Sequence, residues 1–266
     1  MKLIVEGKPA DMAVSCVGDL LRDRPDGTIA LVNGRHMEPD RHLKDGDSVC
    51  FMEGGREFVA KASGTLLSER YSRPVYERLA KARIGVAGLG GIGSHVAEAL
   101  VRAGVGHIVI ADFDEVDQTN LNRQNYSRRD IGKTKAEATL RILKDIDPDA
   151  DIVAHCVKVT PDNVLGIFST CDIVCEAFDT PTAKAMLVES ILSLDMDIKV
   201  VSCSGMAGFD SSNTVSTVRR MERLYVCGDG VSDASEGAGL VASRVMVCAG
   251  HVAHMAIRLA LSRSEP

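Results

Sequence analysis

The chain has 266 residues, of which 45% are hydrophobic and 26% charged, and its mean hydropathy is +0.04. These values predict one large globular domain or a large and a small one, and they exclude a disordered, collagen-like or coiled-coil chain. The net charge of −6 offers no general attraction to phosphate backbones, so no nucleic-acid partner is expected. The most apolar long segment, 245–261, is too short and too polar for a membrane span, and we interpret it as a buried helix.

Eight cysteines are spread along the chain without the dense spacing of a secreted disulfide scaffold, and no signal sequence precedes them. We therefore expect a cytoplasmic protein.

Residues 1–55 predict a small α+β unit. Apolar runs and turn residues predict a helix over 17–22 and strands over 2–5, 28–32 and 48–52. Residues 56–82 are expected to form a basic linker that includes a helix, because the stretch 56–83 holds seven Lys or Arg and only three Glu.

From residue 83 the pattern alternates between strand and helix. Strands are predicted over 84–87, 107–111, 151–155, 172–176 and 199–202, and helices over 94–103, 133–145 and 182–194. Such alternation with short connections predicts an α/β domain over 83–266, with a Rossmann-like, mostly parallel sheet and helices on both faces.

A glycine-rich loop follows the first of these strands and opens a helix. Gly88, Gly90 and Gly93, with Gly91 between them, have the spacing that lets a backbone approach a phosphate at a helix N-terminus. Asp112 lies at the end of the next strand, where a carboxylate accepts ribose hydroxyls. A nucleotide is therefore expected, although a tight turn without a ligand is the alternative. The loop alone does not distinguish NAD, FAD and ATP.

The segment after Asp112 carries polar groups suited to a triphosphate. Amide, guanidinium and ammonium groups there would neutralise phosphates, for which a hydride-transfer enzyme has no need. The alternative is a solvated polar loop with a helix start. The residues that carry these groups are Asn120, Arg123, Gln124 and Lys135, and Asp114, which precedes them, is a further candidate for nucleotide binding.

These motifs, in order and spacing over about 70–266, resemble the ThiF/MoeB adenylyltransferases related to ubiquitin-activating enzymes. Within that superfamily the chain is most similar to the short type of ThiF, which adenylates a sulfur carrier protein in thiamine biosynthesis. The residues that carry the resemblance are Arg70-Tyr-Ser-Arg73, the loop 88–94, Asp112-Phe-Asp114, Asn120-Leu-Asn-Arg-Gln124, Lys135, Glu176-Ala-Phe-Asp179, Ser204-Gly-Met-Ala-Gly208 and Gly228-Asp-Gly-Val-Ser232.

The resemblance implies a mechanism. The carboxy-terminal glycine carboxylate of a carrier attacks the α-phosphorus of ATP, and this gives an acyl-adenylate and pyrophosphate. Asp112 binds the ribose, the glycine loop passes the α-phosphate, and Asp179 holds Mg²⁺. Phosphates are contacted by Asn120, Arg123, Gln124 and Lys135. The carboxylate is ionised at neutral pH, so no general base is required.

The resemblance further implies a homodimer in which Arg73 reaches the ATP phosphates of the partner subunit. Alternatively, Arg73 is only one more surface charge, and Asp179 is a cap for the helix that begins near residue 182.

The chain departs from the family pattern at three places. Relatives have paired CxxC motifs for zinc, whereas here the nearest pair, Cys171 and Cys175, is on a predicted strand where four residues span about 13 Å, so no zinc site is expected. Lys184 stands where relatives have arginine, which leaves its role open. Cys227 is the cysteine nearest the loop where some relatives form a covalent link, but we expect a buried thiol and no obligatory covalent step.

Residues 1–55 resemble ThiS, the β-grasp sulfur carrier, through Leu31-Val-Asn-Gly34 and 43–49, and they end in Gly54-Gly55. A carrier reacts through a terminal carboxylate, but here Arg56 follows. The domain is therefore expected to be a fused accessory module, unless cleavage after Gly55 releases a carrier.

Adenylation of a ThiS-like carrier is the favoured function. A threonylcarbamoyladenosine dehydratase-like enzyme acting on tRNA, a nicotinamide oxidoreductase and a scaffold that does not bind ATP remain as alternatives. The oxidoreductase would leave Asn120, Arg123 and Lys135 without a role.

Overall fold

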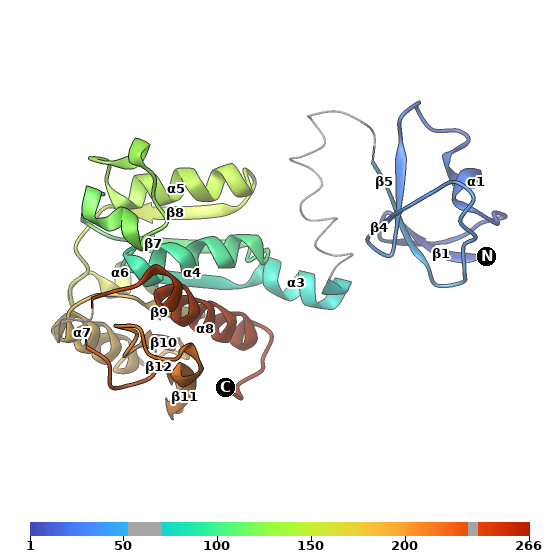
Figure 1. Cartoon of the computed structure of the whole chain (residues 1–266). Helices are drawn as coiled ribbons and strands as arrows, with labels where there is room; N and C mark the ends of the chain where they lie inside the picture. The colour runs from blue at the N-terminus through green and yellow to red at the C-terminus, as the bar shows by residue number, and fades with distance from the viewer. Residues whose placement is uncertain (53–70, 234–238) are drawn as a thin grey trace. The chain divides into compact units, whose positions relative to one another are not determined.

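The computed structural model describes residues 1–52, 71–233 and 239–266, which form two compact units, Met1–Glu77 and Arg78–Pro266 (Figure 1). Of the predicted linker, the structure describes only residues 71–82. They contain helix α3 (Arg73–Lys81). Gly54 and Gly55, after which the alternative of a released carrier would require cleavage, lie outside the described residues.

The smaller unit is a five-stranded sheet with the helix α1 (Val17–Leu21) packed on it. In the strand order β2-β1-β5-β3-β4, the central pair β1 and β5 is parallel and the other pairs are antiparallel. The strands are β1 (Lys2–Val5), β2 (Lys8–Asp11), β3 (Ile29–Val32), β4 (Arg35–Met37) and β5 (Ser48–Met52).

Two strands of this sheet, β2 and β4, were not predicted. Each returns from a two-residue turn in which both residues have positive φ, Glu6-Gly7 and Asn33-Gly34, as hairpin turns require. The returning strands have only three or four residues, Lys-Pro-Ala-Asp in β2 and Arg-His-Met in β4, and these short runs carry no strand signal in the sequence.

The larger unit is a seven-stranded sheet in the order β11-β12-β10-β9-β6-β7-β8, parallel except for β11. The prediction of a Rossmann-like α/β domain is confirmed. Its strands are β6 (Arg83–Ala87), β7 (His107–Ala111), β8 (Asp151–His155), β9 (Ile173–Glu176), β10 (Lys199–Cys203), β11 (Ser216–Met221) and β12 (Leu224–Gly228).

Helices cover both faces of this sheet (Figure 1). One face packs against α4 (Gly91–Arg102), α5 (Lys135–Ile146) and α8 (Ala242–Ala260) around buried residues such as Val86 and Ile110. The other packs against α6 (Val164–Phe168) and α7 (Pro181–Leu192) around Val174 and Val200. Among the described residues, no helix is long and apolar enough to cross a membrane.

The strand order positions a ligand site. The chain leaves β6 to form β7 on one side, whereas β9 pairs with β6 on the other side. Open α/β sheets bind ligands where the strand order reverses, outside the carboxyl ends of the strands. The loop after β6, the segment after β7 and the turn after β9 all lie at this end.

Candidate nucleotide site

Two glycines of the loop between β6 and α4 are required by close packing. Gly88 has a φ of +88°, and a Cβ on it would lie 2.8 Å from the carbonyl oxygen of Ala177. A Cβ on Gly93 would lie 1.8 Å from the carbonyl oxygen of Gly88, so glycine is needed for the loop to close on the helix. Gly90 differs, because a Cβ there would meet, within 4 Å and in the described part of the chain, only the Gln124 amide nitrogen at 3.8 Å. The backbone at Gly90 is thus open to a ligand at the N-terminus of α4, the end of a helix that binds phosphate.

The Asp112 carboxylate ties this loop to the strand beside it. It is 7% exposed and accepts hydrogen bonds from the backbone N–H groups of Leu89 (2.6 Å) and Asp114 (2.8 Å). Burial raises the pKa of Asp112, although these two bonds and the nearby Lys135 oppose the rise. Each carboxylate oxygen keeps a further lone pair, which the predicted contact with ribose hydroxyls requires.

The crossover segment after β7 brings Arg123 to the glycine loop. The Arg123 Cγ would lie 3.7 Å from a Cβ on Gly91, and its guanidinium donates to the Asn122 side-chain oxygen (2.9 Å). The Asn120 side chain caps the 3₁₀ helix η1 (Gln118–Asn122), because its Oδ1 accepts a hydrogen bond from the backbone N–H of Asp117 (3.0 Å).

Gln124 is 7% exposed beside Gly90, and its buried Oε1 has no hydrogen-bond partner within the described ranges. An orphaned buried acceptor is costly unless a bound group satisfies it. Gln124 therefore fits a site that receives a ligand at the loop.

Lys135 provides a buried cation at the start of α5. It is 6% exposed, and its Nζ donates to the Asp114 carboxylate at 2.8 Å. An ammonium group has three donors, so two remain for a phosphate after this ion pair. Lys135 and Asp114, both predicted for the site, therefore lie together next to Asp112.

The turn after β9 carries Asp179, which is exposed. The side chain that caps α7 is Thr180, whose hydroxyl accepts from the backbone of Ala183 (3.4 Å), so the alternative that Asp179 is the cap is wrong. The turn approaches the glycine loop, because the Ala177 carbonyl and the Phe178 ring lie 2.8 and 3.0 Å from a Cβ on Gly88.

One exposed carboxylate on a turn that approaches the glycine loop fits Mg²⁺, which proteins bind through one or two carboxylates together with substrate phosphates. No group of three or more His, Cys, Asp or Glu that could hold a metal occurs among the residues described here.

The predicted role of Arg73 stays a prediction. The residue begins α3 in the smaller unit, but its side chain, like the whole of Arg70, lies outside the described part of the structure.

Cys227 lies within β12 and is fully buried. Its thiol lies 3.4 Å from the Thr217 hydroxyl, and burial raises the pKa of Cys227 to about 11. Since the thiolate is the nucleophile, this side chain is unreactive at neutral pH.

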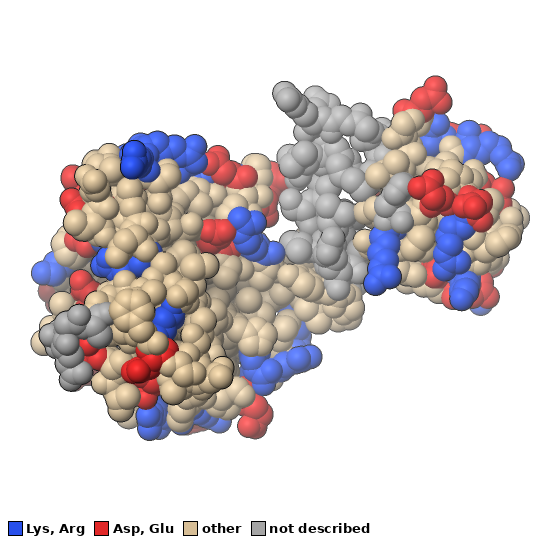
Figure 2. All heavy atoms as spheres, viewed as in Figure 1, with Lys and Arg blue, Asp and Glu red and all other residues tan. Residues whose placement is uncertain are grey.

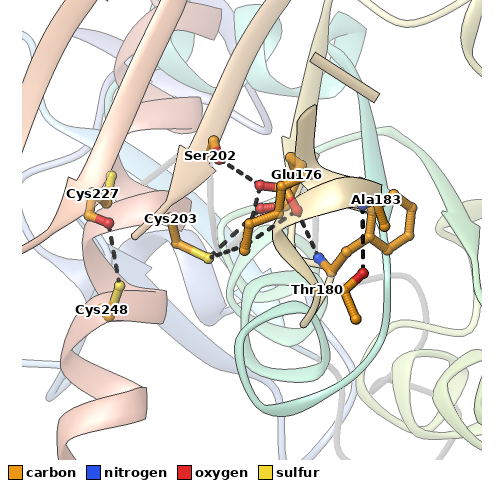
Figure 3. A network of polar contacts seen from close by, with 9 residues as sticks. Glu176, Thr180, Ala183, Ser202, Cys203, Cys227 and Cys248 are labelled. Atoms are coloured by element: carbon orange, nitrogen blue, oxygen red, sulfur yellow. Dashed lines mark hydrogen bonds and ion pairs between the residues drawn. The ribbon is translucent and has the colours of Figure 1, made fainter. Parts of the chain in front are cut away.

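Three polar residues next to this site were given no role from the sequence, although Lys184 was named as a departure from the family pattern. Figure 3 shows Glu176 at the end of β9, where it contacts Ser202 on β10, and Lys184 on α7 also binds it. They come from three different elements, so no local spacing identifies them, although Glu176 belongs to the motif that ends in Asp179.

A hollow of about 580 Å³ lies on the crossover segment. It is lined by Gln118, Leu121, Asn122, Arg128 and Ile131. On the face of the larger unit seen in Figure 2, acidic and basic side chains are interspersed with uncharged ones.

The model of the ThiF family matches residues 63–266. The chain belongs to the ThiF family. This ThiF-family chain is 33% identical over 174 residues to "Adenylyltransferase and sulfurtransferase UBA4" of Candida glabrata, which covers 65% of the chain and 38% of that protein. It is 39% identical over 120 residues to the tRNA threonylcarbamoyladenosine dehydratase of Escherichia coli, with 44% of the chain and 45% of that protein covered. The match thus spans less than half the length of either relative.

The solved structure of the E. coli dehydratase in complex with ATP has a similar fold. The TM-score is 0.69 at 22% sequence identity, over 79% of this chain and 97% of that one. At this identity the likeness concerns the ThiF fold.

Proposed function

We propose that this ThiF-family protein is an ATP-dependent adenylyltransferase that converts a carboxylate into an acyl-adenylate. The observation that carries the proposal is the open backbone at Gly90, at the N-terminus of α4, with the buried Lys135 and Asp112 nearby. Fixed positive charge and the N–H groups at a helix N-terminus, brought together around one loop, suit a triphosphate better than a dinucleotide.

In this proposal the residues of the chain position ATP and stabilise charge. The loop N–H groups bind the α-phosphate, Asp112 accepts from the ribose, and Arg123 and Lys135 neutralise the phosphates. Asn120, Gln124 and Asp114 are the remaining polar residues that we expect to line the nucleotide site. Mg²⁺ held by Asp179 would supply further neutralisation of the phosphates.

The second substrate needs no deprotonation, because its carboxylate is already ionised. One carboxylate oxygen forms a bond to the α-phosphorus, the bond from that phosphorus to the bridging oxygen breaks, and pyrophosphate leaves with the electron pair. Catalysis then depends on alignment and on charge stabilisation.

We infer that the substrate is the terminal glycine of a ThiS-like sulfur carrier, as in thiamine thiazole synthesis, and that a homodimer supplies Arg73 to each site. The five-stranded sheet of the smaller unit, on which α1 packs, supports the assignment of residues 1–55 as a ThiS-like β-grasp module. The relative from C. glabrata, by its name an adenylyltransferase and sulfurtransferase, also supports a sulfur-transfer context.

A second candidate is ATP-dependent activation of a carboxylate on tRNA. It is favoured by the matches to tRNA threonylcarbamoyladenosine dehydratases of E. coli and of Bacillus subtilis, at 39% and 35% identity.

ATP–pyrophosphate exchange distinguishes the two candidates. The reaction is run with no addition, with a ThiS-type carrier ending in Gly-Gly, with the same carrier lacking these glycines, and with threonylcarbamoylated tRNA. We expect exchange only with the intact carrier, lost in Arg123→Ala and retained in Arg129→Ala, an exposed arginine of the same segment. Exchange with the tRNA alone would favour the second candidate.

A further inference from the structure

A buried carboxylate organises the turn that carries Asp179. Glu176, the last residue of β9, has no exposed surface. Its Oε1 accepts from the backbone N–H of Phe178 at 2.7 Å, and its Oε2 accepts from the hydroxyl of Ser202 (Figure 3). Glu176 thus binds the turn on one side and β10 on the other.

Lys184 neutralises this carboxylate. Its Nζ lies 3.2 Å from each Glu176 oxygen and 3.3 Å from the sulfur of Cys203. These contacts direct the ammonium group at Glu176 and Cys203. Burial lowers the pKa of Lys184, but Cys203 and Glu176 outweigh it and raise the pKa overall, so the lysine stays charged.

The ion pair joins α7 to β9 across the turn 177–180. Lys184 lies in the first turns of α7, Thr180 caps that helix, and Glu176 holds the Phe178 backbone. Asp179 is therefore fixed from both sides, while Ala177 packs against Gly88 of the glycine loop.

We propose that Glu176 is a positioning residue: paired with Lys184, it holds the turn 177–180 so that the Asp179 carboxylate is kept in place for Mg²⁺ beside the glycine loop. The proposal rests on the proposed function, which puts ATP and Mg²⁺ at this loop. Glu176 and Lys184 act through Asp179 and touch neither ATP nor the metal.

Glu176→Gln is the direct test. Glutamine has the same shape and can still accept from Phe178, but it removes the charge that faces the partly buried lysine. Isothermal titration calorimetry with a non-hydrolysable ATP analogue measures two quantities, the affinity in EDTA and the Mg²⁺ concentration that gives half of the metal-dependent gain in affinity. We expect the Mg²⁺ midpoint to rise about tenfold and the affinity in EDTA to stay within twofold. Glu189→Gln, at an exposed position of α7, should change neither.

Variants of Lys184 test whether the pair acts as a unit. Lys184→Met should raise the Mg²⁺ midpoint as Glu176→Gln does, and Lys184→Arg should keep it within threefold of wild type. The double variant should be no worse than the more severe single one, since both remove one interaction. If Glu176→Gln does not fold, Ser202→Ala removes one bond to the same carboxylate and should raise the midpoint in the same direction.

An unchanged Mg²⁺ midpoint in folded Glu176→Gln, or an equal loss of affinity with and without metal, overturns the proposal. Failure of the proposed function gives a different result, namely a wild-type protein that binds the analogue with Mg²⁺ but exchanges no pyrophosphate with any substrate. In that case the midpoints still decide whether Glu176 positions Asp179.

Discussion

Replacing Gly90 by alanine tests whether the glycine loop binds a ligand or is only a turn that the fold requires. Gly90 is the N-cap of α4 with φ −74° and ψ −148°, and the added Cβ meets its first described neighbour at 3.8 Å. Alanine is a poorer N-cap, which costs about 1 kcal/mol and lowers the melting temperature of a domain of roughly 150–250 residues by about 2–4 °C. The fold should therefore survive.

Binding of ATP should not survive equally well. A methyl group where the α-phosphate approaches displaces it from at least one loop N–H, and a hydrogen bond to a charged group contributes roughly 1.5–3 kcal/mol. We therefore expect affinity for ATP to fall roughly 10- to 150-fold. Calorimetry measures the affinity, and differential scanning fluorimetry measures the melting temperature.

Gly93→Ala is the matched comparison, because its Cβ would lie 1.8 Å from the Gly88 oxygen and should disrupt the loop itself. If Gly90→Ala binds ATP as tightly as wild type, the phosphate does not pass this loop and the reasoning fails.

Three further predictions concern buried groups. Asp112→Asn replaces one of the two acceptor oxygens that face backbone N–H groups by a donor. The variant should lose about 2 kcal/mol of unfolding free energy in urea and should bind ATP more weakly. Unchanged stability would contradict the role of Asp112 in joining the glycine loop to β7. Burial raises the pKa of Asp130, but hydrogen bonds from Ser127 together with the nearby Arg141 outweigh burial and lower the pKa overall. The stability that this carboxylate adds is therefore complete above about pH 4 and is lost as pH falls through the folded-state pKa. Asp130→Asn should thus lose about 2 kcal/mol at pH 7, and the difference from wild type should shrink in acid; a difference that grows in acid would reverse the sign. Iodoacetamide at pH 8 should label the exposed Cys156 and spare Cys227, as peptide mass spectrometry would show, and rapid labelling of Cys227 would contradict its burial.

The sequence predicts the part of the fold in which local signals agree with burial. Strands such as β6 and β7 are short apolar runs with both faces covered, so their composition and their tertiary role coincide. The strands β11 and β12 and the helix α6 were not predicted. β11 is a mostly exposed edge strand containing Arg219 and Arg220, and α6 has only five residues, too few to show a helical period.

The same distinction holds for the site. The glycine loop and Asp112 were found because each follows a strand at a fixed spacing, and the structure brings them together at 2.6 Å through Leu89. The network of Glu176 depends on packing between β9, β10 and α7, which no spacing in the sequence encodes. The cap of α7 shows the limit of local reasoning, since Asp179 and Thr180 are both good capping residues and only the backbone geometry selects Thr180.

Analysis of the products tests the central claim most directly. ATP labelled at the α-phosphate is incubated with the protein, Mg²⁺ and a carrier ending in Gly-Gly, and hydroxylamine is added to trap an activated carboxylate. The account predicts AMP and pyrophosphate in equal amounts, together with a hydroxamate at the terminal glycine of the carrier. Formation of ADP and phosphate, with an unmodified carrier, would mean attack at a different phosphorus and would contradict adenylation.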